Sequence, residues 1–391
     1  MKLLNSVISD TRRWGATLLP ALGVLICSLT APACESIYDD PDDCLQGISL
    51  RFVYEYHMMR GANALPQYVD CITLYVFDKQ GNYVTQQSET SDKLQNENYR
   101  MILQLDPGEY DIVAYGGTAC QAAKFEQTPR WDPQNMPDGA CRNDLAVELP
   151  RRDQLHNASD QLLHELDKDN PHLNKGGLFY GARSLTMPEF NRKKGYIEET
   201  VCLMNDVNDI TVILQELDRP TQINYDDYEF KIVDDNFLFD CDNNVVEIAA
   251  AQSLTPHYTP YFASNITAGY IDTSDVPRDG VYREPDEENR VQVACAEFSV
   301  SRLVMEHIAS ARLVISRKND PEHDIIDIPL IEYLLFSWTY NDRKWMADEQ
   351  EFLDRQNRWS LVFFLQHGLW YDSIISVNNW VVRLNNISDF Q

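Results

Sequence analysis

Apolar and polar residues alternate along most of the chain beyond residue 47. In the first such stretch, Ile48, Leu50 and Phe52 alternate with Ser49 and Arg51. A period of two is typical of a β-strand with one buried face. The same pattern predicts strands over residues 48–56, 70–78, 83–86, 99–105, 110–115, 144–149, 178–183 and 196–204, and then over 208–214, 229–233, 257–262, 291–300, 311–317, 360–366 and 374–384.

Short turn-forming sequences and one leucine-rich segment complete the pattern. Residues 79–82 (KQGN) and 106–109 (DPGE) each separate two predicted strands and so predict two hairpins. The leucines of 152–166 are spaced as in a short surface helix. Strands this frequent, with few helices between them, indicate an all-β chain of antiparallel sandwiches and not βαβ units. We place a domain boundary between Glu199 and Asn208, because the strand ending at Met204 can belong to either side.

The N-terminal 33 residues have the layout of a secretory signal. Basic residues precede an apolar run over 16–29, which ends in small residues directly before Cys34. The run contains a proline and a glycine and is short for a permanent membrane helix. We expect residues 1–33 to be removed as a lipoprotein signal peptide and Cys34 to carry a covalent lipid, although Ala31 stands where an aliphatic residue is usual. The alternative is ordinary secretory cleavage nearby, which leaves Cys34 a plain thiol.

Residues 34–46 form an acidic, proline-broken segment that cannot bury apolar surface. Its aspartates are Asp39, Asp40, Asp42 and Asp43. We interpret it as an extended tether between the lipid and the folded part. We also expect these aspartates to act as a surface-export signal, with a plain solvated linker as the alternative.

The net charge of the chain limits the kinds of partner that it can bind. The full chain has a formal net charge of −28, and residues 1–33 contribute +2, so the 358 residues from Cys34 onward carry −30. Such a charge argues against binding to nucleic acid or to anionic lipid surfaces. With 44% hydrophobic and 11% aromatic residues, the chain can still bury real cores.

The cysteines beyond Cys34 are odd in number, so at least one is unpaired within the chain. Cys120 and Cys141 flank a loop containing proline and glycine and are the expected disulfide if one forms, with buried free thiols as the alternative. No pair has zinc-finger or thioredoxin spacing. The seven cysteines are Cys44, Cys71, Cys120, Cys141, Cys202, Cys241 and Cys295.

The sequence lacks the motifs of common enzymes. It has no nucleophile elbow, zinc-protease helix, dinucleotide fingerprint or phosphate-binding loop. The glycine-rich residues 176–181 lack the spacing of a phosphate cradle and indicate a turn before a strand. We therefore expect no catalysis, no cofactor and no resident metal.

Two weaker metal signals have simpler interpretations. Residues 240–244 (DCDNN) place oxygen ligands as a calcium loop does, but Val245 and Ala251 stand where that loop needs a glycine and a glutamate. We interpret the segment as a turn, with cation binding as the minor alternative. His156, His164 and His172 recur every eight residues and are interpreted as solvated.

Short blocks of sequence in a fixed order carry a family resemblance. They are 34–40 (CESIYDD), 47–56 (GISLRFVYEY), 69–81 (VDCITLYVFDKQG), 105–110 (LDPGEY), 115–117 (YGG), 327–330 (DIPL), 352–355 (FLDR), 360–364 (SLVFF) and 377–383 (VNNWVVR). In this order, and with Cys34, they resemble the fimbrillin-associated anchor lipoproteins of Bacteroidetes, the minor and major fimbrium anchor subunits. The resemblance spans nearly the whole chain beyond the signal.

That resemblance implies two tandem transthyretin-like sandwiches, over residues 47–200 and 201–391, with short helical insertions. It implies a surface-exposed lipoprotein of the cell outer membrane that holds the base of a fimbrium, limits its length and contacts the pilins of the shaft. The alternative is a surface glycan-binding lipoprotein, which would need an exposed aromatic platform. A secreted hydrolase is disfavoured by the missing motifs. Trp380 lies in a strand pattern and indicates core, not platform.

Overall fold

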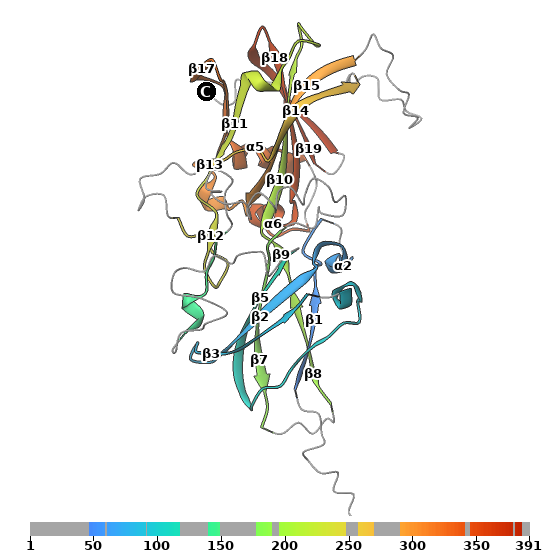
Figure 1. The fold of residues 1–391 in the computed structure, drawn as a ribbon, viewed down its shortest axis with the longest axis vertical. Coiled ribbons are helices and arrows are strands. Elements are labelled where there is room, and N and C mark those ends of the chain that lie inside the picture. The colour runs from blue at the N-terminus through green and yellow to red at the C-terminus, as the bar shows by residue number, and fades with distance from the viewer. Residues whose placement is uncertain are drawn as a thin grey trace, which may run out of the picture. The chain divides into compact units, whose positions relative to one another are not determined.

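The computed structural model describes residues 47–58, 61–90, 92–117, 140–148, 177–189, 195–247, 257–269, 290–340, 345–377 and 380–384 (Figure 1). The chain divides into two units, Met1–Gly47 with Asn191–Ile197, and Ile48–Phe190 with Glu198–Gln391. In the described part of the first unit, the Ile197 N–H donates to the Gly47 carbonyl at 3.0 Å. The helices and strands described below belong to the second unit, apart from Ile197, the first residue of β8.

A five-stranded antiparallel sheet is built from the first half of the chain. Its order is β3 (Tyr83–Glu89), β2 (Cys71–Asp78), β5 (Gly108–Gly117), β7 (Phe179–Met187) and β9 (Met204–Asn205). The interior strand β2, which lies between β3 and β5, is buried at every position but its last, which explains its run of β-branched and aromatic residues. The predicted hairpin across residues 79–82 is confirmed by the pairing of β2 with β3.

A three-stranded sheet orders β4 (Met101–Leu103), β1 (Ile48–Val53) and β8 (Ile197–Cys202). The predicted hairpin across residues 106–109 is wrong, because β4 pairs with β1 whereas β5 pairs with β2 and β7. The turn moves the chain from one sheet to another instead of folding it back. One short helix, α2 (Leu65–Tyr68), precedes β2.

A six-stranded sheet holds most of the second half of the chain. Its order is β14 (Phe262–Gly269), β15 (Arg290–Ser301), β10 (Val207–Glu216), β18 (Arg358–Gln366), β19 (Leu369–Val377) and β20 (Trp380–Leu384). Its pairs are antiparallel except β10 with β18, which run parallel. The single strand predicted over 374–384 is wrong, since the chain there forms two strands, β19 and β20, that pair with each other.

A four-stranded sheet lies in the same half and orders β13 (His257–Tyr258), β11 (Tyr228–Val233), β16 (Arg312–Arg317) and β17 (Asp320–Pro329). Alternation along β11 is strict, with Tyr228, Phe230 and Ile232 buried. The strand β17 was not expected from its sequence, because four acidic residues and two prolines obscure its period.

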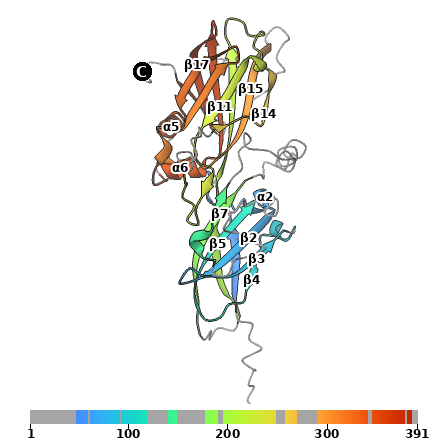
Figure 2. The ribbon, with the colours of Figure 1, turned by 60° about the vertical axis from the view of Figure 1, so that its left-hand side comes forward.

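Two helices follow β17 in the chain (Figure 2). The helix α5 (Leu330–Tyr340) is almost wholly apolar, and α6 (Glu349–Arg355) begins at Asp348, whose carboxylate accepts the Glu351 N–H at 2.9 Å. The core of this half joins apolar residues of the six-stranded sheet, of the four-stranded sheet and of both helices.

A small two-stranded sheet pairs β6 (Val147–Glu148) with β12 (Leu238–Phe239). Phe239 and Cys241 belong to a hydrophobic cluster that also contains Tyr75, Tyr115 and Tyr180. These contacts cross the boundary predicted near residue 200, which stays a prediction. The described 3₁₀ turns are η2 (Asp92–Gln95), η3 (Arg142–Asp144), η5 (Tyr225–Asp227) and η7 (Met305–His307).

The predicted all-β, sandwich-like class is confirmed. No helix in the described ranges is long and apolar enough to cross a membrane. The helix predicted over 152–166 lies outside the described residues.

Candidate functional site

Most residues predicted from the sequence to carry function lie outside the described residues. These are Cys34, Asp39, Asp40, Asp42, Asp43 and Cys120, together with the histidines His156, His164 and His172. Their predicted roles in lipid attachment and export therefore stay predictions. The expected disulfide can be examined through Cys141, which the structure describes.

The thiol of Cys141 is free and donates to a carboxylate oxygen of Asp144 at 3.0 Å. The expected disulfide between Cys120 and Cys141 is therefore not formed in the structure. Cys71 is disulfide-bonded, whereas Cys202, Cys241 and Cys295 carry free thiols.

The calcium-like segment 240–244 is a tight turn, as expected. Residues 78–82 form a second turn with the same pattern of hydrogen bonds. Asp240 accepts the N–H groups of Asp242 and Asn244 at 2.8 and 2.9 Å, and its other oxygen accepts from the Asn244 amide at 3.0 Å. Asp78 accepts from residues 80 and 82 in the same way, at 2.9 and 2.8 Å. The fourth residue of each turn is left-handed, with φ of 64° at Asn243 and 81° at Gly81.

Arg142 joins these two turns. Its N–H donates to the carbonyl of Gly81 at 2.7 Å, while its guanidinium donates to Asp242 at 3.2 Å and to the sulfur of Cys241 at 3.3 Å. Both aspartates of the calcium-like segment thus already serve protein donors. Among the described residues, no group of three or more His, Cys, Asp or Glu side chains is placed to hold a metal.

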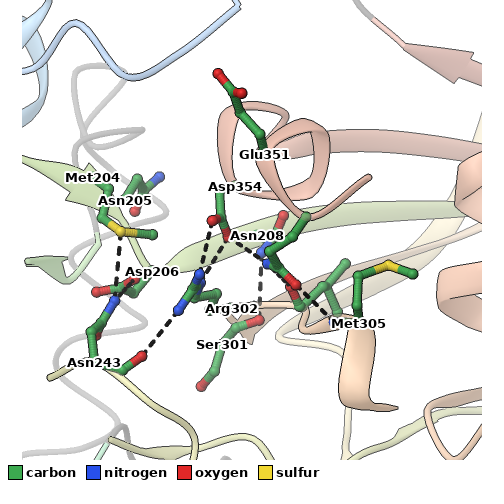
Figure 3. Close-up of polar contacts among 12 residues, drawn as sticks. Met204, Asn205, Asp206, Asn208, Asn243, Ser301, Arg302, Met305, Glu351 and Asp354 are labelled. Atoms are coloured by element: carbon green, nitrogen blue, oxygen red, sulfur yellow. Dashed lines mark hydrogen bonds and ion pairs between the residues drawn. The ribbon is translucent and has the colours of Figure 1, made fainter. Parts of the chain in front are cut away.

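A buried polar cluster surrounds Arg302, which follows β15 (Figure 3). Its Nε and Nη2 donate to the two carboxylate oxygens of Asp354 on α6 at 2.7 and 2.8 Å, and its Nη1 donates to the Asn243 carbonyl at 3.0 Å. Gln350 donates to Asp354 at 2.8 Å and accepts the Met305 N–H at 2.8 Å. Arg302 therefore holds the turn of residues 240–244, the helix α6 and the end of β15 in one hydrogen-bonded group.

The same cluster includes Asp206, the single residue between β9 and β10. Its side chain is fully buried, and its Oδ1 accepts from the Asn243 amide at 2.8 Å. Burial raises the pKa of Asp206 to about 7. The passage from the five-stranded to the six-stranded sheet is thus attached to the turn that Arg302 also holds.

His307 lies in a second buried polar pair. Its Nδ1 lies 2.5 Å from Asp234 Oδ1, and its Nε2 lies 3.2 Å from a carboxylate oxygen of Glu247. The hydrogen bond to Asp234, which outweighs burial, raises the pKa of His307 above its usual value. An Asp–His pair can activate a nucleophile, but here the second ring nitrogen contacts a carboxylate, so this pair stabilises a charge and does not resemble a triad.

The edges of the sheets differ in charge. The edge strand β17 carries Asp320, Glu322, Asp324 and Asp327, and such charges discourage pairing with another strand. The strand β14 lies at an edge of the six-stranded sheet (Figure 2). It has eight residues and no charged side chain, and its Ile266 is 40% exposed. Among the described strands, β14 pairs only with β15, over all eight of its residues.

Exposed aromatic residues are scarce in the described ranges. Tyr371, 55% exposed beside Leu369 on β19, is the one aromatic among the strongly exposed large hydrophobic side chains there. Trp359 is buried, and Trp338, Trp345 and Trp370 are partly buried. The described residues thus show no platform of stacked aromatics for a sugar.

This chain has a fold similar to those of several solved structures, and it matches them over nearly their whole length. A candidate adhesin from Bacteroides thetaiotaomicron VPI-5482 is 38% identical, with a TM-score of 0.66 over 87% of this chain and 98% of that one. A candidate polysaccharide-binding protein from the same organism is 24% identical, with a TM-score of 0.59 over 87% and 99%. The fimbrial anchor protein Mfa2 from Porphyromonas gingivalis is 14% identical, with a TM-score of 0.56 over 86% and 99%. The last two likenesses show the fold alone.

No curated protein matches the chain. The profile of the family described as fimbrillin-A associated anchor proteins Mfa1 and Mfa2 matches residues 41–386. This match spans most of the chain and agrees with the blocks of sequence that resembled the same family. The chain belongs to the fimbrillin-A associated anchor protein family.

Proposed function

We propose that this protein is an outer-membrane lipoprotein that anchors a fimbrium to the cell surface and limits its length, without catalysis. The observation that carries the proposal is the family match over residues 41–386. It is supported by the sequence order of signal, Cys34 and acidic tether, which suits a chain held to a membrane by lipid. In this role the mature protein is surface-exposed, with pilins of the shaft as its partners.

The proposed contact with the shaft is strand addition at β14. An edge strand leaves backbone donors and acceptors unpaired, and a strand from another chain can add to them. The strand β14 is long enough for such a ladder and lacks the charges that guard β17. Because main-chain hydrogen bonds and apolar side chains would supply the affinity, the contact should resist salt in spite of the net charge of −30 on the chain from Cys34 onward.

Deleting the gene product tests the anchor role. We expect fimbriae that are overlong or shed into the medium, because nothing then ends assembly or holds the base. Fimbrial length by electron microscopy and the amount of pilin in the medium are the measurements. Cell-bound fimbriae of normal length in the deletion strain would count against the anchor.

A charge placed in β14 tests the contact separately. Ile266→Lys should abolish cross-linking to pilin while the protein folds, because an added strand would have to bury the ammonium group. The matched control is Glu322→Lys on the exposed, already charged β17, which should cross-link as wild type does. Normal cross-linking by Ile266→Lys would remove β14 as the site.

Glycan binding is the competing function, and the same purified protein tests it. An anchor should capture pilin in a pull-down of surface proteins and bind no sugar on a glycan array, whereas a glycan-binding protein should give the reverse. We expect pilin in the pull-down and no sugar on the array. Tyr371→Ala is the variant for any sugar signal, since Tyr371 is the exposed aromatic of the described residues.

A further inference from the structure

Asp206 and Asn243 together leave two buried oxygen atoms without partners. Asp206 is 0% exposed and Asn243 is 2% exposed. The Asn243 Nδ2 donates to Asp206 Oδ1 at 2.8 Å, yet Asp206 Oδ2 and Asn243 Oδ1 have no hydrogen-bond partner. Buried acceptors are rarely left in this state, because each loses its hydration without replacement.

The guanidinium of Arg302 is hydrogen-bonded to other groups and not to Asp206. The Arg302 guanidinium donates to both oxygens of Asp354 and to the carbonyl of Asn243, and no hydrogen bond joins it to Asp206. Asp354, on α6, adds a like charge that raises the pKa of Asp206, after burial as the main cause. Arg302 lowers the pKa of Asp206, but by less than burial raises it. An ionised Asp206 would therefore be a buried charge whose counter-ion is already paired with Asp354.

The other titratable groups around Asp206 are acidic themselves. Tyr54 directly after β1, Tyr115 on β5 and Tyr180 on β7 interact electrostatically with it, and Cys241 on the 240–244 turn shares the surroundings of Tyr115. Burial raises the pKa of the tyrosine hydroxyls, so these groups are neutral at physiological pH and supply no positive charge.

We infer that Asp206 is a neutral carboxylic acid in the folded protein and that its Oδ2–H donates to Asn243 Oδ1. With the bond from Asn243 Nδ2 to Asp206 Oδ1, this proton closes a reciprocal acid–amide pair and satisfies both buried acceptors at once. The pair fastens the passage between β9 and β10 to the turn at residues 240–244. Ionisation removes one of the two bonds and leaves two oxygens in repulsion, so this attachment depends on a proton.

The inference sets the sign of a pH effect. Burial raises the pKa of Asp206 to about 7, above the value of about 3.9 in an unfolded chain. Between these values the folded state binds the proton and the unfolded state does not. The contribution of Asp206 to stability is therefore present at acid pH and falls as pH rises from about 4 to about 7.

The substitution Asp206→Asn tests the inference in the purified full chain. An amide has the shape of the protonated acid and can make both bonds to Asn243 without a proton. We expect the ratio of the unfolding constants of wild type and Asp206→Asn to rise about tenfold per pH unit between pH 5 and pH 7. Urea unfolding at several pH values measures it. Parallel profiles, or a variant less stable than wild type at pH 8, would overturn the inference.

The matched control is Asp240→Asn, which changes an aspartate of the same turn that is partly exposed and can keep its bonds to the backbone as an amide. We expect its pH profile to run parallel to that of wild type. If Asp206→Asn does not fold, the test is instead amide hydrogen exchange in the wild-type protein. The Val246 N–H, bonded to the Leu238 carbonyl beyond the turn, should then exchange faster at pH 8 than at pH 6 after correction for intrinsic rates. Equal corrected rates would overturn the inference.

A bound cation could satisfy the same two oxygens, and calcium distinguishes that case. We expect calcium chloride and a chelator to give equal urea midpoints for wild type at pH 8. A rise with calcium in wild type that Asp206→Asn lacks would mean that a cation, not a proton, completes the pair. That result would also overturn the inference.

Discussion

The guanidinium of Arg302 meets the carboxylate of Asp354 side by side, with Nε 2.7 Å from Oδ1 and Nη2 2.8 Å from Oδ2. Both side chains are largely buried, at 17% and 6% exposure. Two parallel charge-assisted bonds fix direction as well as distance. Because the same arginine holds the Asn243 carbonyl, the pair determines where the helix α6 lies against the turn at residues 240–244.

Removing one partner of this pair should be far more costly than removing an exposed one. Asp354→Ala leaves a buried guanidinium without its carboxylate partner, and we expect a loss of about 3–5 kcal/mol in the free energy of unfolding. The control is Glu199→Ala, which breaks the exposed pair with Arg183, where we expect a loss below about 1 kcal/mol. Urea unfolding measures both. Equal losses would mean that the buried pair does not organise the cluster.

His307 predicts a pH effect that His307→Gln should remove. The hydrogen bond to Asp234 raises the pKa of His307. Its stabilising contribution is therefore complete below the unfolded pKa of about 6.5 and is lost as pH rises through the raised folded value. We expect wild type to exceed His307→Gln in stability by about 2 kcal/mol at pH 6 and by less at pH 9. A difference that stays constant with pH would show that the imidazole is not charged in the fold.

Replacing Cys34 should release the protein from the membrane. We expect Cys34→Ala to move to the soluble fraction and to lose labelling by a fatty-acid probe, because a single residue carries the proposed lipid. The control is Cys202→Ala, which removes an exposed free thiol and should leave the protein in the membrane fraction. Membrane retention of Cys34→Ala would contradict lipid attachment at this cysteine.

The acidic tether should be needed for display but not for lipidation. Changing Asp39, Asp40, Asp42 and Asp43 to Asn should protect the protein from protease added to whole cells and leave the fatty-acid label in place. The control neutralises the exposed acids Asp320, Glu322 and Asp324 of β17 and should not alter display. Unchanged cleavage of the tether variant from outside would reduce the tether to a spacer.

The sequence predicted those strands whose buried positions form a recognisable hydrophobic pattern over a few consecutive residues. The strand β11 could be predicted because its buried and less buried positions alternate, and β2 because nearly all of its residues are apolar and buried. The helix α5 (LIEYLLFSWTY) was missed because it is apolar on nearly every side and so shows no helical period. The turn at residues 106–109 has hairpin chemistry, and only the pairing of β4 with β1 shows that it changes sheets.

The polar cluster could not be predicted, because its bonds join residues far apart in sequence. Asn243 and Asp206 are 37 positions apart, and Arg302 and Asp354 are 52 apart. In a chain with 61 acidic residues, no local feature distinguishes Asp206 from an aspartate in solvent. One hint exists, since Asp206 interrupts the otherwise strand-like run from Met204 to Val212.

The parallel pairing of β10 with β18 sets an order of events for the newly made chain. Residues 209–216 pair with residues 358–365, so the middle of the six-stranded sheet contains a strand from near the C-terminus. Contacts of such long range form slowly and only after the last strands are available. Until β18 is made, β10 can pair with β15 on one side, but its other side lacks the strand that completes the sheet. A chain truncated before β18 would lack an interior strand, so this half reaches its final form only after synthesis of the chain is complete.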